Sequence, residues 1–178
     1  MKKTEIRITG LGGQGVVLAG QILGRAAVYD GKNAVQTQSY GAEARGSVAK
    51  SEVIVSDGKI GFPVVRKCDA LVAMTQETAE KNIKDLKEDG VLLVDSGLVK
   101  NTPETKARTF RIQITQAAEK NVGEKLYANM VMLGALTQII NVVAEEAMEK
   151  AIVDSFPKKT VDTNLKAYKI GRELAESL

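Results

Sequence analysis

The 178-residue sequence contains no histidine or tryptophan, only three prolines and a single cysteine. Because histidine is the commonest general base and the most frequent metal ligand, its absence removes most acid–base and metal chemistry from this chain. The one cysteine, Cys68, cannot by itself hold an iron–sulfur cluster or a four-cysteine zinc, or close an internal disulfide. We therefore expect no catalytic residue and no metal ligand here, and any redox centre must lie on a partner.

The charges are nearly balanced, with 25 lysines and arginines against 22 aspartates and glutamates and a formal net charge of +3. Such a chain has no strong field to attract nucleic acid or an anionic membrane. The most apolar later stretch, residues 130–143, is too short to span a bilayer, and no apolar signal region precedes the first strand-like pattern. We expect a cytoplasmic protein that folds as one domain over residues 1–178.

A glycine-rich turn follows the first strand-like segment. Residues 5–9 alternate between apolar and polar side chains, and Gly10-Leu11-Gly12-Gly13-Gln14-Gly15 then leads into an apolar stretch typical of a helix over residues 15–30. In a strand, glycine turn and helix in this order, the glycines let a ligand come close to the backbone. The free N–H groups at the helix start then favour a phosphate or carboxylate. The sequence therefore predicts an anion site at this turn.

The turn matches the dinucleotide fingerprint, but one expected residue is missing. A conventional NAD site has an acidic residue at the end of the second strand, where it binds the ribose hydroxyls. Here that region reads Val35-Gln36-Thr37-Gln38. An NAD site is therefore disfavoured, while a turn that is merely tight, or that packs against a neighbouring subunit, stays open as an alternative.

The rest of the chain alternates strand and helix. We expect residues 33–36 to pair in parallel with the first strand, and residues 48–55 to pair with 60–62 across a hairpin turn at 56–59. Gly20 and Gly24 share one face of the first helix, where another backbone can come close. The fold class is α/β, a Rossmann-like, mainly parallel sheet of about six strands flanked by helices, with an antiparallel hairpin insertion. The other expected elements are strands at 70–74, 91–95 and 110–114 and helices at 76–89, 129–143, 144–154 and 161–178.

Several motifs follow one another along the chain: Gly10-Leu11-Gly12-Gly13-Gln14-Gly15, Ser39-Tyr40-Gly41-Ala42-Glu43-Ala44-Arg45-Gly46, Ser51-Glu52-Val53-Ile54-Val55-Ser56, Asp69-Ala70-Leu71-Val72-Ala73-Met74, and Asn129 with Leu133-Gly134-Ala135. In this order they resemble the gamma subunit, or gamma-equivalent domain, of 2-oxoacid:ferredoxin oxidoreductases. The resemblance covers nearly the whole chain and is closest to the short gamma chains of 2-oxoglutarate-type enzymes. Ala42 and Ser47 depart from the proline and glycine usual there.

The resemblance implies that a 2-oxoacid is oxidatively decarboxylated with coenzyme A, giving an acyl-CoA, carbon dioxide and reduced ferredoxin. The implied partners are alpha and beta subunits, and in some members a ferredoxin-like delta subunit, which carry the thiamine diphosphate, Mg²⁺ and iron–sulfur clusters. This chain would hold no cofactor firmly, although coenzyme A could engage it, and in isolation it could form a homodimer. The implied candidates for contact with coenzyme A or another subunit are Gly12, Gly13, Gln14, Gly15 and Arg45.

Two other functions stay open at this point. The smaller subunit of indolepyruvate:ferredoxin oxidoreductase shares the fold and the glycine turn, and only the substrate pocket on the partner separates the two cases. A free-standing nucleotide-binding Rossmann-like domain would use the same turn for a dinucleotide. Binding of NAD, NADP or FAD to the isolated chain would favour that alternative.

Overall fold

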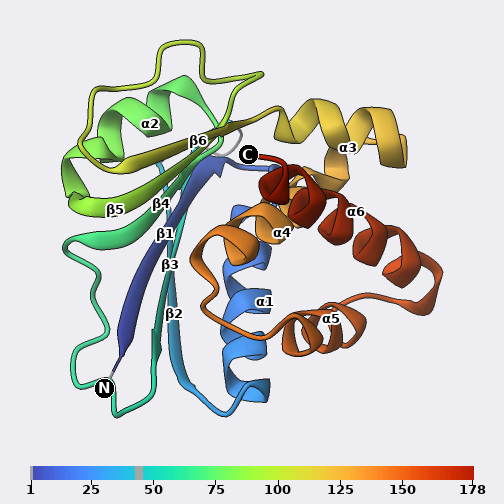
Figure 1. Ribbon diagram of the computed structural model, residues 1–178, viewed down its shortest axis with the longest axis horizontal. Helices are drawn as coiled ribbons and strands as arrows, with labels where there is room; N and C mark the ends of the chain where they lie inside the picture. Colours follow the sequence, from blue (N-terminus) through green and yellow to red (C-terminus); the bar gives the residue numbers. More distant parts are fainter. Residues whose placement is uncertain (1, 43–45) are drawn as a thin grey trace.

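The computed structural model describes residues 2–42 and 46–178. Its centre is a six-stranded sheet with the order β2-β3-β1-β4-β5-β6 (Figure 1). The strands are β1 (Lys3–Leu11), β2 (Asn33–Tyr40), β3 (Val48–Ser56), β4 (Cys68–Ala73), β5 (Leu86–Asp95) and β6 (Arg108–Ile112). The helices are α1 (Val16–Tyr29), α2 (Gln76–Asn82), α3 (Ile114–Val122), α4 (Ala128–Ile140), α5 (Glu145–Val153) and α6 (Lys158–Glu176), with short 3₁₀ turns at Ile83–Asp85 and Lys125–Tyr127.

The sheet is parallel from β1 through β4 and β5 to β6, whereas β3 runs antiparallel to both β1 and β2. This arrangement confirms the α/β class with a mainly parallel sheet and an antiparallel hairpin. The predicted pairing of β1 with β2 is wrong, because β3 lies between them. Only residues 41–47 connect β2 to β3, too little chain for a crossover, so the two strands form a hairpin.

The hairpin predicted at residues 56–59 is wrong as well. Residues 57–67 form an irregular connection between β3 and β4, and neither Ile60 nor Phe62 belongs to a strand. The reason is that β3 already pairs with β1 along one edge and with β2 along the other. A further strand therefore has no free backbone groups on β3 to pair with.

The helix predicted over residues 76–89 ends at Asn82 and gives way to a 3₁₀ turn and to β5. Tertiary contacts outweigh local helix propensity here. The carboxylate of Asp85 accepts a hydrogen bond of 2.6 Å from Nη1 of Arg7, and Leu86 pairs with Cys68 in the sheet. These contacts hold the chain extended where its sequence alone would continue the helix.

Both faces of the sheet are covered. The side chains of its central strands are therefore apolar on both faces. Helices α1, α4, α5 and α6 lie over one face, and α2 with its neighbouring connections lies over the other (Figure 1). In β4, Val72 faces the first layer and Leu71 the second, and Leu93 and Leu92 alternate in the same way in β5. Burial on two sides is what favours near-continuous apolar strands in parallel sheets.

A close approach does occur at Gly20, where a Cβ would lie 2.9 Å from the Cβ of Ser51 on β3, but the neighbouring atoms belong to side chains and not to another backbone as expected. At Gly24 a Cβ would meet only the Cβ of Gln36, at an ordinary 3.8 Å, so no close approach occurs. None of the helices in the described ranges is both long enough and apolar enough to cross a membrane.

The closest helix contact joins α4 to α6. A Cβ on Gly134 would lie 2.9 Å from the carbonyl carbon of Tyr168, and a Cβ on Gly171 would lie 2.7 Å from that of Val131. On each helix, a glycine thus lets the backbone of the other helix pack at close distance. The crossing fixes the distance between α4 and α6, which together carry much of the site described next.

Candidate functional site

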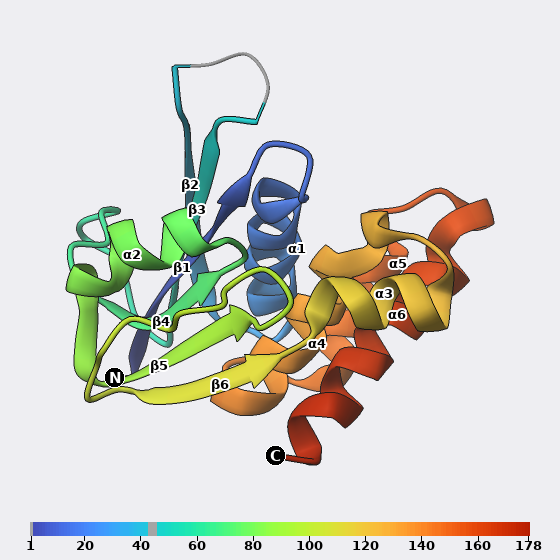
Figure 2. The same cartoon turned by 90° about the horizontal axis from the view of Figure 1, so that it is seen from above.

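The glycine turn connects β1 to α1 at the carboxyl edge of the sheet (Figure 2). Gly13 and Gly15 have φ angles of 93° and 71°, in the left-handed region that residues with a Cβ rarely adopt. The amide of Gly12 donates to the carbonyl of Ser47 at 2.8 Å. This backbone bond ties the turn to the start of β3 and does not depend on which side chain stands at residue 47.

Gln14 braces the turn from within. Its Oε1 accepts a hydrogen bond of 2.7 Å from the amide of Leu11, and a Cβ on Gly10 would lie 2.5 Å from the same oxygen. Gln14 was a candidate contact for a ligand, but its carboxamide oxygen is already used. The structure therefore makes it a residue that positions the turn.

Gly15 brings α4 against the start of α1. A Cβ on Gly15 would lie 2.9 Å from Cγ of Asn129, whose Nδ2 donates to the Gly15 carbonyl at 3.4 Å. Asn129 is only 5% exposed, so the contact is buried. Gly15 thus serves packing as well as backbone conformation, and it links the turn directly to α4.

The amides at the start of α1 keep the character of an anion site. Within the described residues no side chain caps this helix, and its first turn contains no acidic residue. The N–H groups of a first helical turn have no intrahelical acceptor and carry the positive end of the helix dipole. Gly12 and Gly13 are exposed beside them. A phosphate or carboxylate can therefore approach the turn without displacing a side chain.

A cavity of about 170 Å³ opens beside the turn. Its walls come from the first turn of α1, the first two turns of α6, the start of α4, and the segments that precede α4 and α6, and its lining is mainly apolar. Two carboxamides add polarity: Asn129 and Asn164 are 5% and 3% exposed, and neither Oδ1 has a protein partner among the described residues. The lining residues are Leu18, Leu126, Tyr127, Asn129, Phe156, Thr160 and Asn164.

Sequence reasoning missed most of this cavity. Asn129 belonged to a motif of the family resemblance, but no role was predicted for it, and nothing near Asn164 signals a site. A weak signal is the apolar helix pattern interrupted by a buried asparagine on both α4 and α6. Of the predicted site residues, Gly12 to Gly15 lie together, and Arg45 lies outside the described residues.

Two buried groups outside the turn and cavity, Asp95 and Cys68, have structural roles. Asp95 is fully buried and accepts hydrogen bonds from the amides of Gly97 and Thr115 at 3.0 and 2.9 Å and from the Thr115 hydroxyl. Each oxygen of its carboxylate accepts at least one hydrogen bond, and the bond from the Thr115 amide caps the first turn of α3. Burial raises the pKa of the Cys68 thiol to about 11, so it is not a nucleophile at neutral pH. Among the described residues, no group of acidic and cysteine side chains could hold a metal ion.

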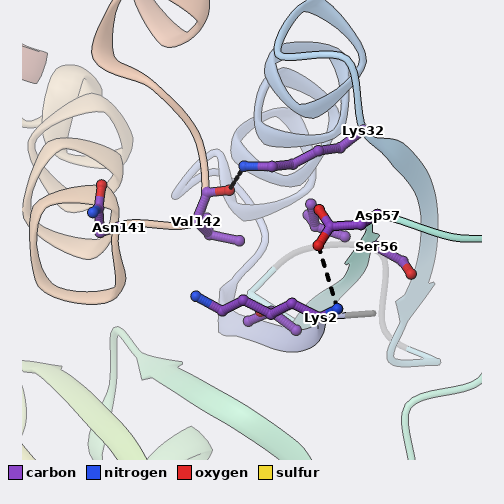
Figure 3. A pocket seen from close by; sticks show the side chains of 8 residues that line it. Lys2, Lys32, Ser56, Asp57, Asn141 and Val142 are labelled. Carbon is purple, nitrogen blue, oxygen red and sulfur yellow. Dashed lines mark hydrogen bonds between the residues drawn. The ribbon is translucent and has the colours of Figure 1, made fainter.

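A smaller hollow of about 30 Å³ lies near the amino end of β1 (Figure 3). Its walls are tied together from within: Nζ of Lys32 donates to the carbonyl of Val142 at 2.7 Å, and the amide of Lys2 donates to Asp57 at 3.3 Å. A space of this size holds about one water molecule. It is part of the packing between β1, β3 and the end of α4.

Fold and site define an α/β domain whose glycine turn and adjoining cavity lie at the carboxyl edge of its sheet. The chain belongs to the pyruvate ferredoxin/flavodoxin oxidoreductase family, which it matches over residues 5–174. This finding confirms the resemblance predicted from the sequence.

Two similar proteins are 2-oxoglutarate synthase subunits KorC. That of Methanocaldococcus jannaschii is 51% identical over 99% of this chain and 96% of its own length. That of Methanothermobacter thermautotrophicus is 47% identical over 97% of this chain and 95% of its own.

Two solved structures are also similar. The keto/oxoacid ferredoxin oxidoreductase gamma subunit from Geobacter sulfurreducens has a TM-score of 0.89 at 49% identity, covering 98% of this chain and 99% of that one. The 2-oxoglutarate:ferredoxin oxidoreductase from Magnetococcus marinus, with 2-oxoglutarate, coenzyme A and succinyl-CoA bound, has a TM-score of 0.91 at 26% identity. It covers 100% of this chain, which matches 32% of the longer protein.

Proposed function

We propose that this chain is the gamma subunit of a 2-oxoglutarate:ferredoxin oxidoreductase and acts as one domain over residues 1–178. The observation that carries the proposal is the 51% identity, over nearly the full length, to a 2-oxoglutarate synthase subunit. Identity to a pyruvate synthase subunit, PorC of Methanocaldococcus jannaschii, is lower, at 32%. In the proposed reaction, 2-oxoglutarate loses carbon dioxide and two electrons, which reduce ferredoxin, and the acyl group passes to the thiol of coenzyme A.

In this proposal the chemistry takes place on other subunits. Thiamine diphosphate, Mg²⁺ and the iron–sulfur clusters belong to the alpha and beta subunits and, where present, to a ferredoxin-like delta subunit. The single thiol of this chain, buried with its pKa raised, supports that division of labour. A cytoplasmic location stays a prediction.

The role proposed for this chain is to bind coenzyme A. The phosphates of coenzyme A suit the uncapped start of α1 and the exposed Gly13 beside it, while Gly12, whose amide donates to Ser47, would shape the turn. Its pantetheine arm is largely apolar but contains two amides, which suit an apolar cavity with the carboxamides of Asn129 and Asn164. The volume of about 170 Å³ accommodates only part of the molecule, so the rest would extend towards the partner subunits.

The proposed function is tested in the assembled enzyme. Coexpression of this chain with the thiamine-binding and ferredoxin-like partners should give a complex that reduces ferredoxin only with both a 2-oxoacid and coenzyme A. We expect 2-oxoglutarate to be preferred over pyruvate and 2-oxoisovalerate. Isolation of the chain without any thiamine-dependent partner, or micromolar binding of NAD to the chain alone, would contradict the proposal.

The coenzyme A site is tested by Asn164→Ala and its matched control Asn121→Ala. Both asparagines donate from Nδ2 to a carbonyl four residues earlier at 2.9 Å, but Asn121 is exposed on α3, away from the cavity. Asn164→Ala removes the hydrogen bond proposed between Asn164 and coenzyme A, which is worth about 0.5–1.5 kcal/mol. We therefore expect the KM for coenzyme A to rise roughly 2- to 12-fold. The KM for 2-oxoglutarate should not change.

Gln14→Ala tests the turn by removing its brace, and Arg45→Ala tests the remaining sequence-based candidate. We expect both to raise the KM for coenzyme A, Gln14→Ala through a loosened turn. If the KM for coenzyme A is unaltered in Gln14→Ala, Arg45→Ala and Asn164→Ala, the cavity and turn have no part in its binding, although the subunit assignment could still hold.

A further inference from the structure

A second surface lies at the opposite end of β1 from the glycine turn. Two adjoining hollows of about 390 and 260 Å³ share Lys3 and lie along the amino ends of β1, β4 and β5. Residues 6–9 of β1, at about 3.3 Å each, separate the hollows from the turn that begins at Gly10, so this surface is distinct from the proposed coenzyme A site. We call it the amino-edge surface, and its defining residues are Lys3, Phe62, Val64, Arg66, Lys67 and Lys87.

The centre of the amino-edge surface is apolar and exposed. Phe62 and Val64, in the connection between β3 and β4, are 57% and 46% exposed and form this centre, whereas Ile139 and Ile140 of the second hollow are partly buried and pack with the core on the other face of the sheet. Figure 1 shows the connection, in teal, beside the amino end of β1. Apolar side chains grouped in this way, with an arginine and an aromatic ring among them, are typical of protein interfaces.

A buried ion cluster holds this connection in place. Arg7 on β1, which is 4% exposed, donates from Nη2 to the carbonyl of Val65 at 3.1 Å and pairs with Glu52 and Asp85 at 2.7 and 2.6 Å. Val65 is itself buried, and the side chains on either side of it point outward. Phe62 and Val64 are therefore presented on a fixed backbone, which lowers the entropy cost of binding a partner.

The rim of the surface is positive. Six basic side chains and three carboxylates line the two hollows, which gives them together a formal charge of +3. This equals the formal net charge of the whole chain. Lys87 is neutralised locally by Asp69 at 2.7 Å. Arg66 and Lys67 are exposed, form no ion pair with other described residues, and Arg66 lies over the ring of Phe62 at 5.5 Å. The charge left for a partner is therefore next to the apolar centre.

We infer that the amino-edge surface is an interface at which this chain docks an acidic surface of another subunit in the assembly. Charge complementarity selects the acidic partner, and steers its approach. The exposed Phe62 and Val64, held beside the free charges of Arg66 and Lys67, suit a subunit contact with an apolar anchor more than a purely electrostatic encounter with a small electron carrier. The inference rests on the proposed function, which supplies the partner subunits.

The test measures binding of this chain to the complex of the remaining subunits at low and high salt. We expect Arg66→Glu/Lys67→Glu to weaken binding at least tenfold at low salt and much less at high salt. Phe62→Ala should accelerate dissociation at both salt concentrations. The control Lys100→Glu/Lys166→Glu reverses two exposed lysines outside the surface and should bind like the wild type, and circular dichroism checks that each variant folds.

The outcomes separate the two proposals. If the wild-type chain does not bind the remaining subunits, the proposed function fails and the interface fails with it. If the wild type binds but Arg66→Glu/Lys67→Glu and Phe62→Ala bind equally well, the interface alone is overturned. Unchanged assembly with a raised KM for ferredoxin would assign the surface to the electron carrier and likewise overturn the inference.

Discussion

The substitution Gly134→Ala tests the contact that holds α4 and α6 together. The added methyl group would lie 2.9 Å from the carbonyl carbon of Tyr168 and 3.0 Å from the amide nitrogen of Arg172, and nearer still to the Tyr168 carbonyl oxygen. Favourable contacts of carbon atoms begin at about 3.5 Å. All three neighbouring atoms belong to the backbone of α6, so no side chain can rotate away and the helices must separate.

The magnitude follows from two opposing terms. Overpacking costs about 1–3 kcal/mol, and the upper end applies because the obstacle is backbone. Alanine is favoured over glycine in a helix by about 1 kcal/mol, which leaves a net loss near 2 kcal/mol. For a domain of this size that loss lowers Tm by about 4–8 °C.

Gly24→Ala is the matched control, because it makes the same chemical change in α1 with only an ordinary contact of 3.8 Å to Gln36. It should raise stability by about 0.5–1 kcal/mol. Thermal unfolding of the isolated chain, followed by circular dichroism, compares both variants with the wild type. A Gly134→Ala variant at least as stable as the wild type would refute the packing argument.

Three further predictions concern buried polar groups. Because burial raises the pKa of Cys68 from 9.0 to about 11, stability should fall by roughly 2 kcal/mol as the pH rises from 9 to 11, and urea unfolding of Cys68→Ala should lack this loss. Asp95→Asn replaces the carboxylate that accepts from Thr115 with an amide, whose NH₂ group cannot accept a hydrogen bond. The free energy of unfolding should fall by about 2–4 kcal/mol in the same assay, and an unchanged urea midpoint would contradict the capping role. Arg7→Lys cannot make the forked contacts of a guanidinium, so limited proteolysis should cut residues 57–67 faster than in the wild type.

Local patterns in the sequence predicted the elements whose stability is local. The glycine turn between β1 and α1 could be located because a left-handed backbone at Gly13 and Gly15 requires glycine. The alternation of apolar residues located β3, and the length and apolarity of α4 identified it as a buried helix. Motif order along the chain identified the family, because it reflects common ancestry and does not depend on knowing the contacts.

Only the tertiary structure decided how these elements pair and what they enclose. The place of β3 between β1 and β2 depends on hydrogen bonds between segments far apart in sequence, and α2 stops early because Arg7 binds Asp85. The candidate site divides in the same way. Its glycine turn is a local feature readable from adjacent residues, whereas its cavity exists because the crossing of α4 and α6 brings Asn129 and Asn164 beside Leu18, a proximity that no local spacing encodes.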